Sequence, residues 1–337
     1  MKKTFAVVCS LWPMLFLLAL APAAAKIDYA QRADVKAFIE SMQTQHGFDP
    51  RELSRWFAQT QPIPNVIKAI RPPKNPGIRS WQTYRSRFVE PIRIAAGRRF
   101  MREYAKDLDE AETRYGVPAA VIAAIIGVET IYGKNMGNFN SFAALTTLAF
   151  DYPPRAPLFR KELEELLLLA RDEQRSPLDY VGSYAGALGL PQFLPSSRRR
   201  FAVDFDQDGR IDLVESRQDA IGSVANFLAQ HGWQKGQPIA VRVLAGGDGL
   251  QTLIDEGIAP RMTPEAMLAL GVDLQKVGAG ATDREIPNQP AALIDFVTPH
   301  AATEYRLGYQ NFWAITRYNR SSFYAASVMD LAEAIAR

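Results

Sequence analysis

Apolar residues recur every three or four positions along most of the chain, and this spacing predicts α-helices. Runs at about 35–42 and 53–57 predict two short amphipathic helices near the start. Prolines and a glycine at 72–77 interrupt the pattern and predict a loop or linker. A long helix is then expected from about residue 89 to residue 115, ended by Gly116.

Four further segments read as helices. The segment 118–128 begins with proline and is apolar on every face, so it predicts a buried helix that ends at Glu129. Amphipathic helices are expected at about 157–173 and 219–233. The last stretch, 321–337, returns to helical spacing behind a serine cap.

The composition changes between the last two of these helices. Segments 238–243 and 291–297 are short and rich in residues that favour strands, and glycine-rich turns around 246–249 and 278–280 divide this region. These features predict a small β subdomain at about 236–312. The whole chain is therefore expected to be α+β and mainly α.

The first 25 residues have the three regions of a secretory signal peptide. Two lysines precede an apolar run at 5–20, and small residues at 21–25 form a cleavage site. The alternative is a membrane anchor, but Ser10, Trp12 and Pro13 interrupt the run. Export with cleavage after Ala25 is expected, without stable membrane insertion.

Charge and cysteine content narrow the function classes. The chain has 39 basic and 36 acidic residues, and loss of Lys2 and Lys3 with the signal would leave a nearly balanced charge. That balance argues against nucleic-acid binding. Cys9 is the single cysteine and matches a lipoprotein acylation site poorly, so the exported chain is expected to carry neither thiol nor lipid.

Glu129 follows eight apolar or small residues at 121–128. Burial disfavours the charged form of a carboxylate, and the carbonyl end of a helix adds partial negative charge, so both effects raise the pKa of Glu129 toward the range of a general acid. The alternative is a glutamate that turns outward at the helix end, where solvent and Lys134 stabilise it.

An acidic stretch at 204–215 fits the twelve-residue EF-hand pattern, with glycine at position six. Its expected calcium ligands are the carboxylates of the alternate positions, the backbone carbonyl of position seven and the carboxylate of position twelve: Asp204, Asp206, Asp208, Arg210 and Glu215. The alternative is an acidic turn without metal. Because a single loop is present, a structural ion is expected rather than a switch.

Three motifs, at 127–130, 182–197 and 219–226, carry a family resemblance. The apolar segment ending in Glu129, followed by the glycine-rich stretch, resembles the goose-type lysozyme and lytic transglycosylase superfamily. All three motifs together are similar to the lytic murein transglycosylase B family, which has membrane-bound and soluble members. The similarity covers most of the chain and includes Tyr318.

This resemblance implies a lysozyme-like helical core with an additional helical domain and a small β subdomain. The expected division is a signal peptide at 1–25, an N-terminal helical domain at 26–110, a catalytic core with the EF-hand-like loop at 111–235, the β subdomain at 236–312 and a C-terminal segment at 313–337 that packs back on the core. A soluble periplasmic protein is expected, with outer-membrane association as the alternative.

The resemblance also implies a reaction. Glu129 would act as the only acid and base in cutting the β-1,4 bond between N-acetylmuramic acid and N-acetylglucosamine of peptidoglycan, leaving 1,6-anhydromuramic acid ends. Ser183 and Gln192 match positions that hydrogen-bond the sugar, and their alternative role is loop structure. Tyr84, Tyr318 and Tyr324 match the sugar-facing wall, and their alternative role is core packing.

In the resembled family the carboxylate just before the Ala-Ile-Gly-Ser sequence at 220–223 can close the metal site, so Asp219 competes with Glu215 for that role. No organic cofactor is expected. The expected partner is the glycan strand of peptidoglycan, and proteins of cell-wall synthesis or division are further candidates. Two alternative functions stay open, a hydrolytic muramidase and a non-catalytic, calcium-stabilised peptidoglycan-binding protein.

Overall fold

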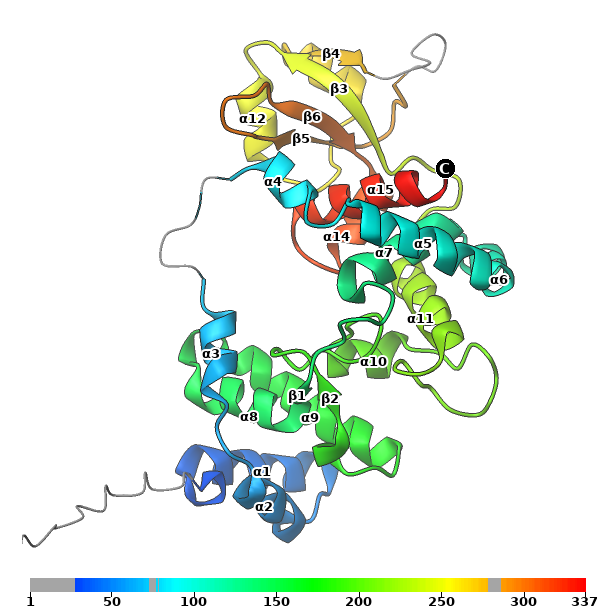
Figure 1. The fold of residues 1–337 in the computed structure, drawn as a ribbon. Coiled ribbons are helices and arrows are strands. Elements are labelled where there is room, and N and C mark those ends of the chain that lie inside the picture. Colours follow the sequence, from blue (N-terminus) through cyan, green and yellow to red (C-terminus); the bar gives the residue numbers. More distant parts are fainter. Residues whose placement is uncertain (1–27, 73–76, 78, 278–285) are drawn as a thin grey trace, which may run out of the picture.

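A computed structural model describes residues 28–72, 77, 79–277 and 286–337. The fold is mainly helical and includes a two-stranded and a four-stranded antiparallel sheet (Figure 1). The prediction of a mainly α, α+β protein is confirmed. The expected signal peptide and the glycine-rich turn at 278–280 lie outside the described residues, as does most of the expected loop at 72–77.

The first helices pack on a helical hairpin from the middle of the chain. The helices α1 (Ala33–His46), α2 (Pro50–Gln59) and α3 (Pro64–Ile70) share one apolar core with α8 (Ser141–Asp151) and α9 (Ala156–Asp172), and form the lower end of Figure 1. The two predicted N-terminal helices and the predicted helix at 157–173 are confirmed. Short 3-10 turns flank them at Tyr29–Gln31, Pro153–Arg155 and Pro177–Asp179.

The long helix expected at 89–115 is wrong in one respect. The chain forms α5 (Pro91–Glu103) and α6 (Ala105–Tyr115), and Tyr104 between them leaves the helical conformation at φ −109° and ψ 28°. The two halves pack on different partners, because α5 lies against α7 and α15 whereas α6 lies mainly against α11. Apolar spacing continues through the break, so periodicity alone does not reveal it.

The predicted buried helix is α7 (Ala119–Thr130). All eight residues from Val121 to Val128 are buried, as predicted. Around it lie α4 (Trp81–Arg85), α10 (Pro195–Phe201), α11 (Arg217–Gln230), α14 (Gln310–Thr316) and α15 (Ser322–Ile335). Ser321 caps α15 as predicted, since its side chain accepts the amide of Tyr324.

The four-stranded sheet has the order β4-β3-β6-β5 and lies at the upper end of Figure 1. The strands are β3 (Ala240–Gly246), β4 (Asp273–Lys276), β5 (Ala292–Phe296) and β6 (Glu304–Gly308). Two short helices, α12 (Leu250–Asp255) and α13 (Pro264–Ala269), lie between β3 and β4 in the sequence. Both predicted strand segments are confirmed. The second sheet pairs β1 (Phe139–Asn140) with β2 (Val181–Gly182).

Buried apolar side chains of the described residues gather in three clusters, around α7, between the first helices and the α8–α9 hairpin, and on the four-stranded sheet. The second cluster combines residues from both sides of the boundary expected at 110 and 111. The division of the chain into domains stays a prediction.

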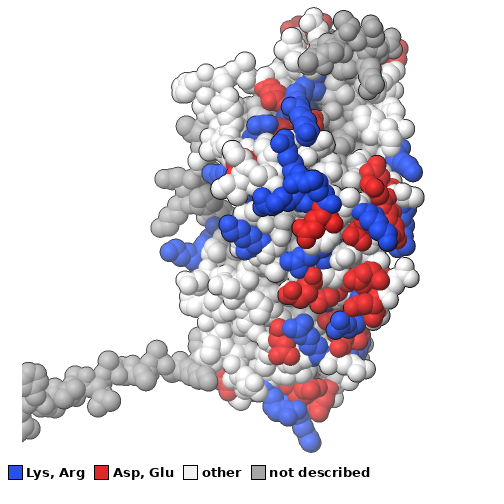
Figure 2. Space-filling view, turned by 45° about the vertical axis from the view of Figure 1, so that its right-hand side comes forward, with Lys and Arg blue, Asp and Glu red and all other residues white. Residues whose placement is uncertain are grey.

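The surface carries charged side chains of both signs. On the face shown in Figure 2, acidic and basic side chains lie interspersed along one side, and a broad part carries uncharged side chains. Within the described part of the chain, no single helix has the length and apolar character needed to cross a membrane, and one bent pair, α6 with α7, meets that test of length and composition.

A buried ion cluster joins the four-stranded sheet to α15. Asp330 accepts hydrogen bonds at 2.8 Å from Arg306, at 2.8 Å from Arg242 and at 2.5 Å from Arg85. Arg306 is fully buried and also pairs with Glu304 at 2.6 Å. Burial opposes the ionisation of Asp330, but the hydrogen bonds and charges of Arg306, Arg85 and Arg242 together outweigh it and hold the pKa of Asp330 below its ordinary value.

Replacing Asp330 by Asn is expected to lower the free energy of unfolding by about 3–5 kcal/mol, because it leaves the buried Arg306 without the countercharge that it shares with the more exposed Arg85 and Arg242. Urea unfolding followed by circular dichroism measures this loss. The control is Glu110→Gln, which breaks an exposed pair with Arg114 at 3.1 Å and should change stability by less than about 1 kcal/mol. Equal small losses in both variants would contradict a stabilising role for the cluster.

Candidate active site

Glu129 lies in the last turn of α7, and part of the residue stays exposed. The hydroxyl of Tyr324 donates a hydrogen bond of 2.6 Å to its Oε1 atom. Burial of the carboxyl group raises the pKa of Glu129 to about 7, and the Tyr324 hydroxyl works in the opposite direction because it stabilises the charged form. The shift is in the predicted direction, and burial is its main cause.

The backbone that follows Glu129 is held in an unusual conformation. Ile131 and Tyr132 have φ angles of 53° and 56°, in the left-handed region that β-branched and bulky residues rarely adopt. Such strain persists only where the surroundings impose it, and it concentrates at functional sites. The end of α7 is therefore a constrained platform for the carboxylate.

Two contacts that the sequence did not indicate fix this platform. The buried Arg93 donates from Nε to the carbonyl of Gly127 at 2.8 Å. The buried Thr130 hydroxyl lies 3.0 Å from the carbonyl oxygen of Leu190, in the glycine-rich stretch. Each contact joins segments more than thirty residues apart in sequence. Arg93 stands in none of the three motifs, and the motif that contains Thr130 does not indicate the partner of its hydroxyl.

The three predicted tyrosines come together around Glu129. Tyr318 and Tyr324 have nearly parallel rings whose centroids are 6.3 Å apart. Burial, and then the negative charge of Glu129, raise the pKa values of Tyr84, Tyr318 and Tyr324. Tyr84 and Tyr318 are half-buried, whereas Tyr324 is buried and spends its hydroxyl on the carboxylate. Tyr324 is thus placed to orient Glu129 rather than to face solvent.

The glycine-rich stretch places Gln192 near this group and keeps Ser183 within its own turn. The Tyr318 hydroxyl donates to the carbonyl of Pro191 at 2.7 Å, next to Gln192. Gln192 has a φ of 52°. Its side-chain nitrogen, Nε2, donates to the backbone carbonyls of Gly189 at 2.9 Å and Met136 at 3.1 Å. The Ser183 hydroxyl accepts the amide of Ala187 at 3.1 Å, which is a turn-stabilising role.

Carboxylate oxygens of Asp204, Asp206 and Asp219 lie within 4.8 Å of one another. Asp219 is fully buried, and its two oxygens accept the amides of Phe205 and Asp212 at 2.7 Å each. Burial is the main cause that raises the pKa of Asp219, and the charge of Asp206 adds to it. A cluster of hard, mutually repelling oxygens fits a calcium ion.

The side chains of Glu215 and Asp208, which were also expected to bind the metal, lie outside this cluster of carboxylates. Glu215 has a side chain that is 79% exposed and is outside the cluster, so the geometry favours Asp219 as the closing ligand. The Asp208 carboxylate is paired with its neighbour Arg210 at 3.2 Å. Between the two candidates that the sequence left open, the buried residue is therefore the one that joins Asp204 and Asp206.

The chain is similar to known proteins along most of its length. Residues 30–333 match the family model described as the transglycosylase SLT domain. The chain is 37% identical over 318 residues to the membrane-bound lytic murein transglycosylase B of Escherichia coli (strain K12), covering 92% of this chain and 84% of that relative.

Solved structures are also similar. The soluble lytic transglycosylase SltB1 from Pseudomonas aeruginosa has a TM-score of 0.81 and 42% identity, covering 90% of this chain and 98% of that one. The Escherichia coli lytic transglycosylase Slt35, solved in complex with calcium, has a TM-score of 0.77 and 38% identity, covering 92% of this chain and 94% of that one.

Replacing Tyr324 by Phe is expected to raise the pKa of Glu129 above its wild-type value, because the hydroxyl stabilises the carboxylate and its loss favours the protonated form. Infrared difference spectra of the carboxyl band across a pH series measure this shift, and Glu129→Gln assigns the band.

The matched control for this titration is Tyr318→Phe, since the Tyr318 hydroxyl donates to the Pro191 carbonyl and not to Glu129. It should leave the transition nearer to its wild-type position. A Tyr324→Phe transition at or below the wild-type pH would show that the hydroxyl does not control this carboxylate.

Proposed function

The chain belongs to the lytic murein transglycosylase B family, and we propose that Glu129 is its single catalytic acid and base in cutting the glycan strands of peptidoglycan. The chain is accordingly an enzyme, a peptidoglycan lytic transglycosylase. The observation that carries the proposed role of Glu129 is its position, a carboxyl group with a pKa raised to about 7 by burial, held by the Tyr324 hydroxyl.

The reaction uses one proton shuttle. The protonated Glu129 donates its proton to the glycosidic oxygen as the bond from that oxygen to C1 of N-acetylmuramic acid breaks. The resulting carboxylate then removes the proton of the 6-hydroxyl group of the same sugar as O6 bonds to C1. The ring closes as the 1,6-anhydro product, N-acetylglucosamine leaves with the first proton, and Glu129 is protonated again.

The surroundings of Glu129 support a route without a second carboxylate. Glycosidases that use a carboxylate nucleophile keep the two groups about 5 Å apart, and a like charge so close would raise the pKa of the first. Burial raises the pKa of Glu129 and the Tyr324 hydroxyl lowers it, and no carboxylate of the described residues contributes to the shift. The substrate's own hydroxyl group can then serve as the nucleophile.

The neighbouring side chains have distinct proposed roles. Tyr324 positions the carboxylate and tunes its pKa. The half-buried rings of Tyr84 and Tyr318 are suited to pack on sugar C–H faces. Gln192, beside the Tyr318 contact, is the candidate for a hydrogen bond to the sugar, whereas the contacts of Ser183 support the loop role better.

Replacing Glu129 by Gln is expected to lower the rate of muropeptide release at least about a thousandfold, because the amide cannot shuttle a proton. Purified peptidoglycan is digested and the products are resolved by mass spectrometry. The wild-type protein should release 1,6-anhydromuramic ends. The matched control is Glu40→Gln, which changes an exposed glutamate on α1 and should leave the rate unchanged.

Three other outcomes of this digestion would contradict the proposal. Reducing-end products would identify a hydrolytic muramidase. Binding of peptidoglycan without any product would favour a non-catalytic binding protein. Equal rates for wild type and Glu129→Gln would remove Glu129 from catalysis.

A structural calcium ion is the second part of the proposal. It would be held by Asp204, Asp206 and Asp219, with the backbone of the loop completing its oxygen shell. Support comes from the cluster of three carboxylates in this chain and from the calcium complex of Slt35. The ion would neutralise a buried negative charge and stabilise the loop beside the start of α11.

Replacing Asp219 by Asn is expected to lower calcium affinity at least about tenfold, whereas Glu215→Gln should change it by less than about threefold. Isothermal titration calorimetry measures both. Calcium at about one hundred times its dissociation constant should also stabilise the wild-type fold by about 2.7 kcal/mol. Equal losses in the two variants would mean that Glu215 takes part, and no wild-type binding would overturn the calcium site.

The proposed site of action is the periplasm. The expected signal peptide at 1–25 supports export, although it lies outside the described residues. The named substrate of the relatives, murein, is an extracytoplasmic polymer, which agrees with this location.

A further inference from the structure

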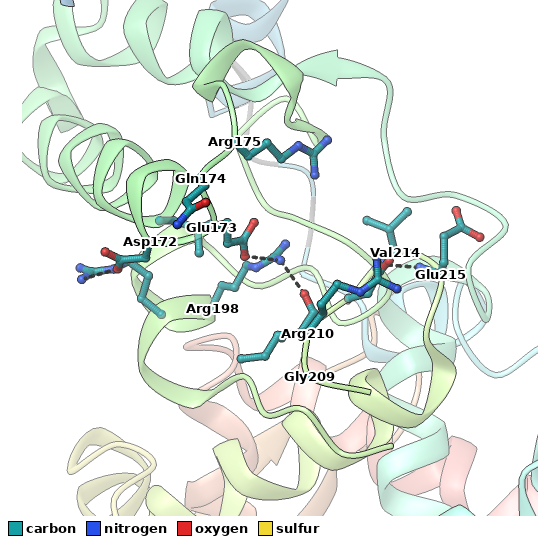
Figure 3. Close-up of a pocket in the computed structure, with 13 residues that line it drawn as sticks. Asp172, Glu173, Gln174, Arg175, Arg198, Gly209, Arg210, Val214 and Glu215 are labelled. Carbon is teal, nitrogen blue, oxygen red and sulfur yellow. Dashed lines mark hydrogen bonds and ion pairs between the residues drawn. The ribbon is translucent and has the colours of Figure 1, made fainter. Parts of the chain in front are cut away.

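A cavity of about 830 Å³ lies apart from the Glu129 site, between the end of α9, the start of α10 and the metal loop at 209–215. Its lining contains four arginines and four acidic residues: Arg175, Arg198, Arg199, Arg210, Asp172, Glu173, Asp212 and Glu215 (Figure 3). Such a mixture of charges suits a ligand that carries both signs.

Several of these charges neutralise one another. Arg198 pairs with Glu173 at 2.6 Å and Arg199 with Asp172 at 3.2 Å. Arg210 pairs with Asp208 at 3.2 Å. These pairs build the walls of the cavity and neutralise part of its charge, although the pair of Arg198 with Glu173 uses only one nitrogen of that guanidinium group.

Arg175 and Glu215 are the lining charges suited to a ligand, because the Asp212 carboxylate already accepts the amides of Val214 and Glu215 at 2.9 Å each. Arg175 donates to the carbonyl of Asp179 at 2.7 Å and lies over the ring of Tyr180, and no ion pair joins it to a carboxylate in the part of the chain that the structure describes. Glu215 meets a cation, Arg217, only at 4.0 Å, and its side chain is 79% exposed. Figure 3 shows these two side chains on separate segments around the cavity.

A buried donor adds to this picture. Arg198 is only 6% exposed, and its Nε atom has no hydrogen-bond partner among the described residues. A buried donor without a partner is unfavourable, and a carboxylate is the acceptor that suits a guanidinium group best. The cavity therefore offers two donors for a carboxylate and one acceptor for a cation.

We propose that this cavity binds a short peptide that carries a carboxylate together with a free ammonium group, the chemistry of the peptide stems of peptidoglycan. Arg175 and Arg198 would receive the carboxylate, and Glu215 the ammonium group. This inference rests on the proposed function, because it adds a peptide subsite to an enzyme that cuts the glycan strand.

The cavity wall is joined to the Glu129 turn through one residue. The amide of Leu190 donates to the carbonyl of Leu213 at 2.8 Å, between the lining residues Asp212 and Val214. The carbonyl of Leu190 receives the Thr130 hydroxyl at 3.0 Å. A stem held in the cavity thus contacts a wall that is hydrogen-bonded, through Leu190, to the residue after Glu129.

Direct binding tests the subsite without turnover. The probe is the free tripeptide L-Ala-γ-D-Glu-meso-diaminopimelate, titrated by calorimetry at constant calcium into wild type, Arg175→Gln, Glu215→Gln and the control Arg51→Gln, an exposed arginine on α2. Each cavity variant should weaken binding about threefold to fivefold, the range of one exposed ion pair, and the control should not. Glutarate, which has carboxylates and no ammonium group, should bind more weakly than the tripeptide to wild type.

Unchanged tripeptide binding in both cavity variants, or no binding by wild type, overturns the subsite. Glutarate binding as tight as the tripeptide overturns the role of Glu215.

A cleavage assay then separates this inference from the proposed function. Wild type should cut stem-bearing strands faster than strands stripped of stems, and Arg175→Gln should lose that preference without a change on stripped strands. If wild type cuts neither substrate, the proposed function fails, while the peptide titration still decides the subsite.

Discussion

The desolvation of one carboxyl group is the constraint on which the rest of the site depends. Glu129 ends a helix whose preceding side chains are all apolar, so α7 cannot lie at the surface and needs cover from α5, α11 and α15. That cover removes solvent from the carboxyl group and raises its pKa to about 7. The same burial that stabilises the core therefore sets the proton affinity of the site.

The four-stranded sheet contributes to this site through α15. Asp330 and Tyr324 lie on the same helix, and the first is locked by arginines of β3, β6 and α4 while the second donates to Glu129. A shift of the sheet would move α15 and change the length of the Tyr324 hydrogen bond. The position of the Tyr324 hydroxyl that holds Glu129 thus depends on ion pairs made farther along the same helix.

Local patterns predicted the elements and the chemistry that depend on neighbouring residues. The apolar run before Glu129 and the spacing of the acidic loop are visible in the sequence, and both led to groups that the structure brings together. Contacts between distant segments were not visible. Nothing near Arg93 indicates that it holds the carbonyl of Gly127, and the break at Tyr104 leaves the apolar spacing intact. The choice of Asp219 over Glu215 depends on the burial of the first turn of α11, which counting positions cannot show.

Leu190 explains how an ion in the proposed calcium loop would influence the proposed reaction without contacting the substrate. Its backbone is hydrogen-bonded on one side to Leu213 and on the other to Thr130. Gly189, before it, has a φ of 66°, and a side-chain carbon there would come within 2.3 Å of the Leu213 carbonyl, so only glycine permits this approach. An ordered loop at 204–219 therefore fixes Leu190, and Leu190 fixes the turn that carries Glu129. A cation that orders the loop would act on catalysis by restricting the conformations of this backbone rather than by polarising the substrate.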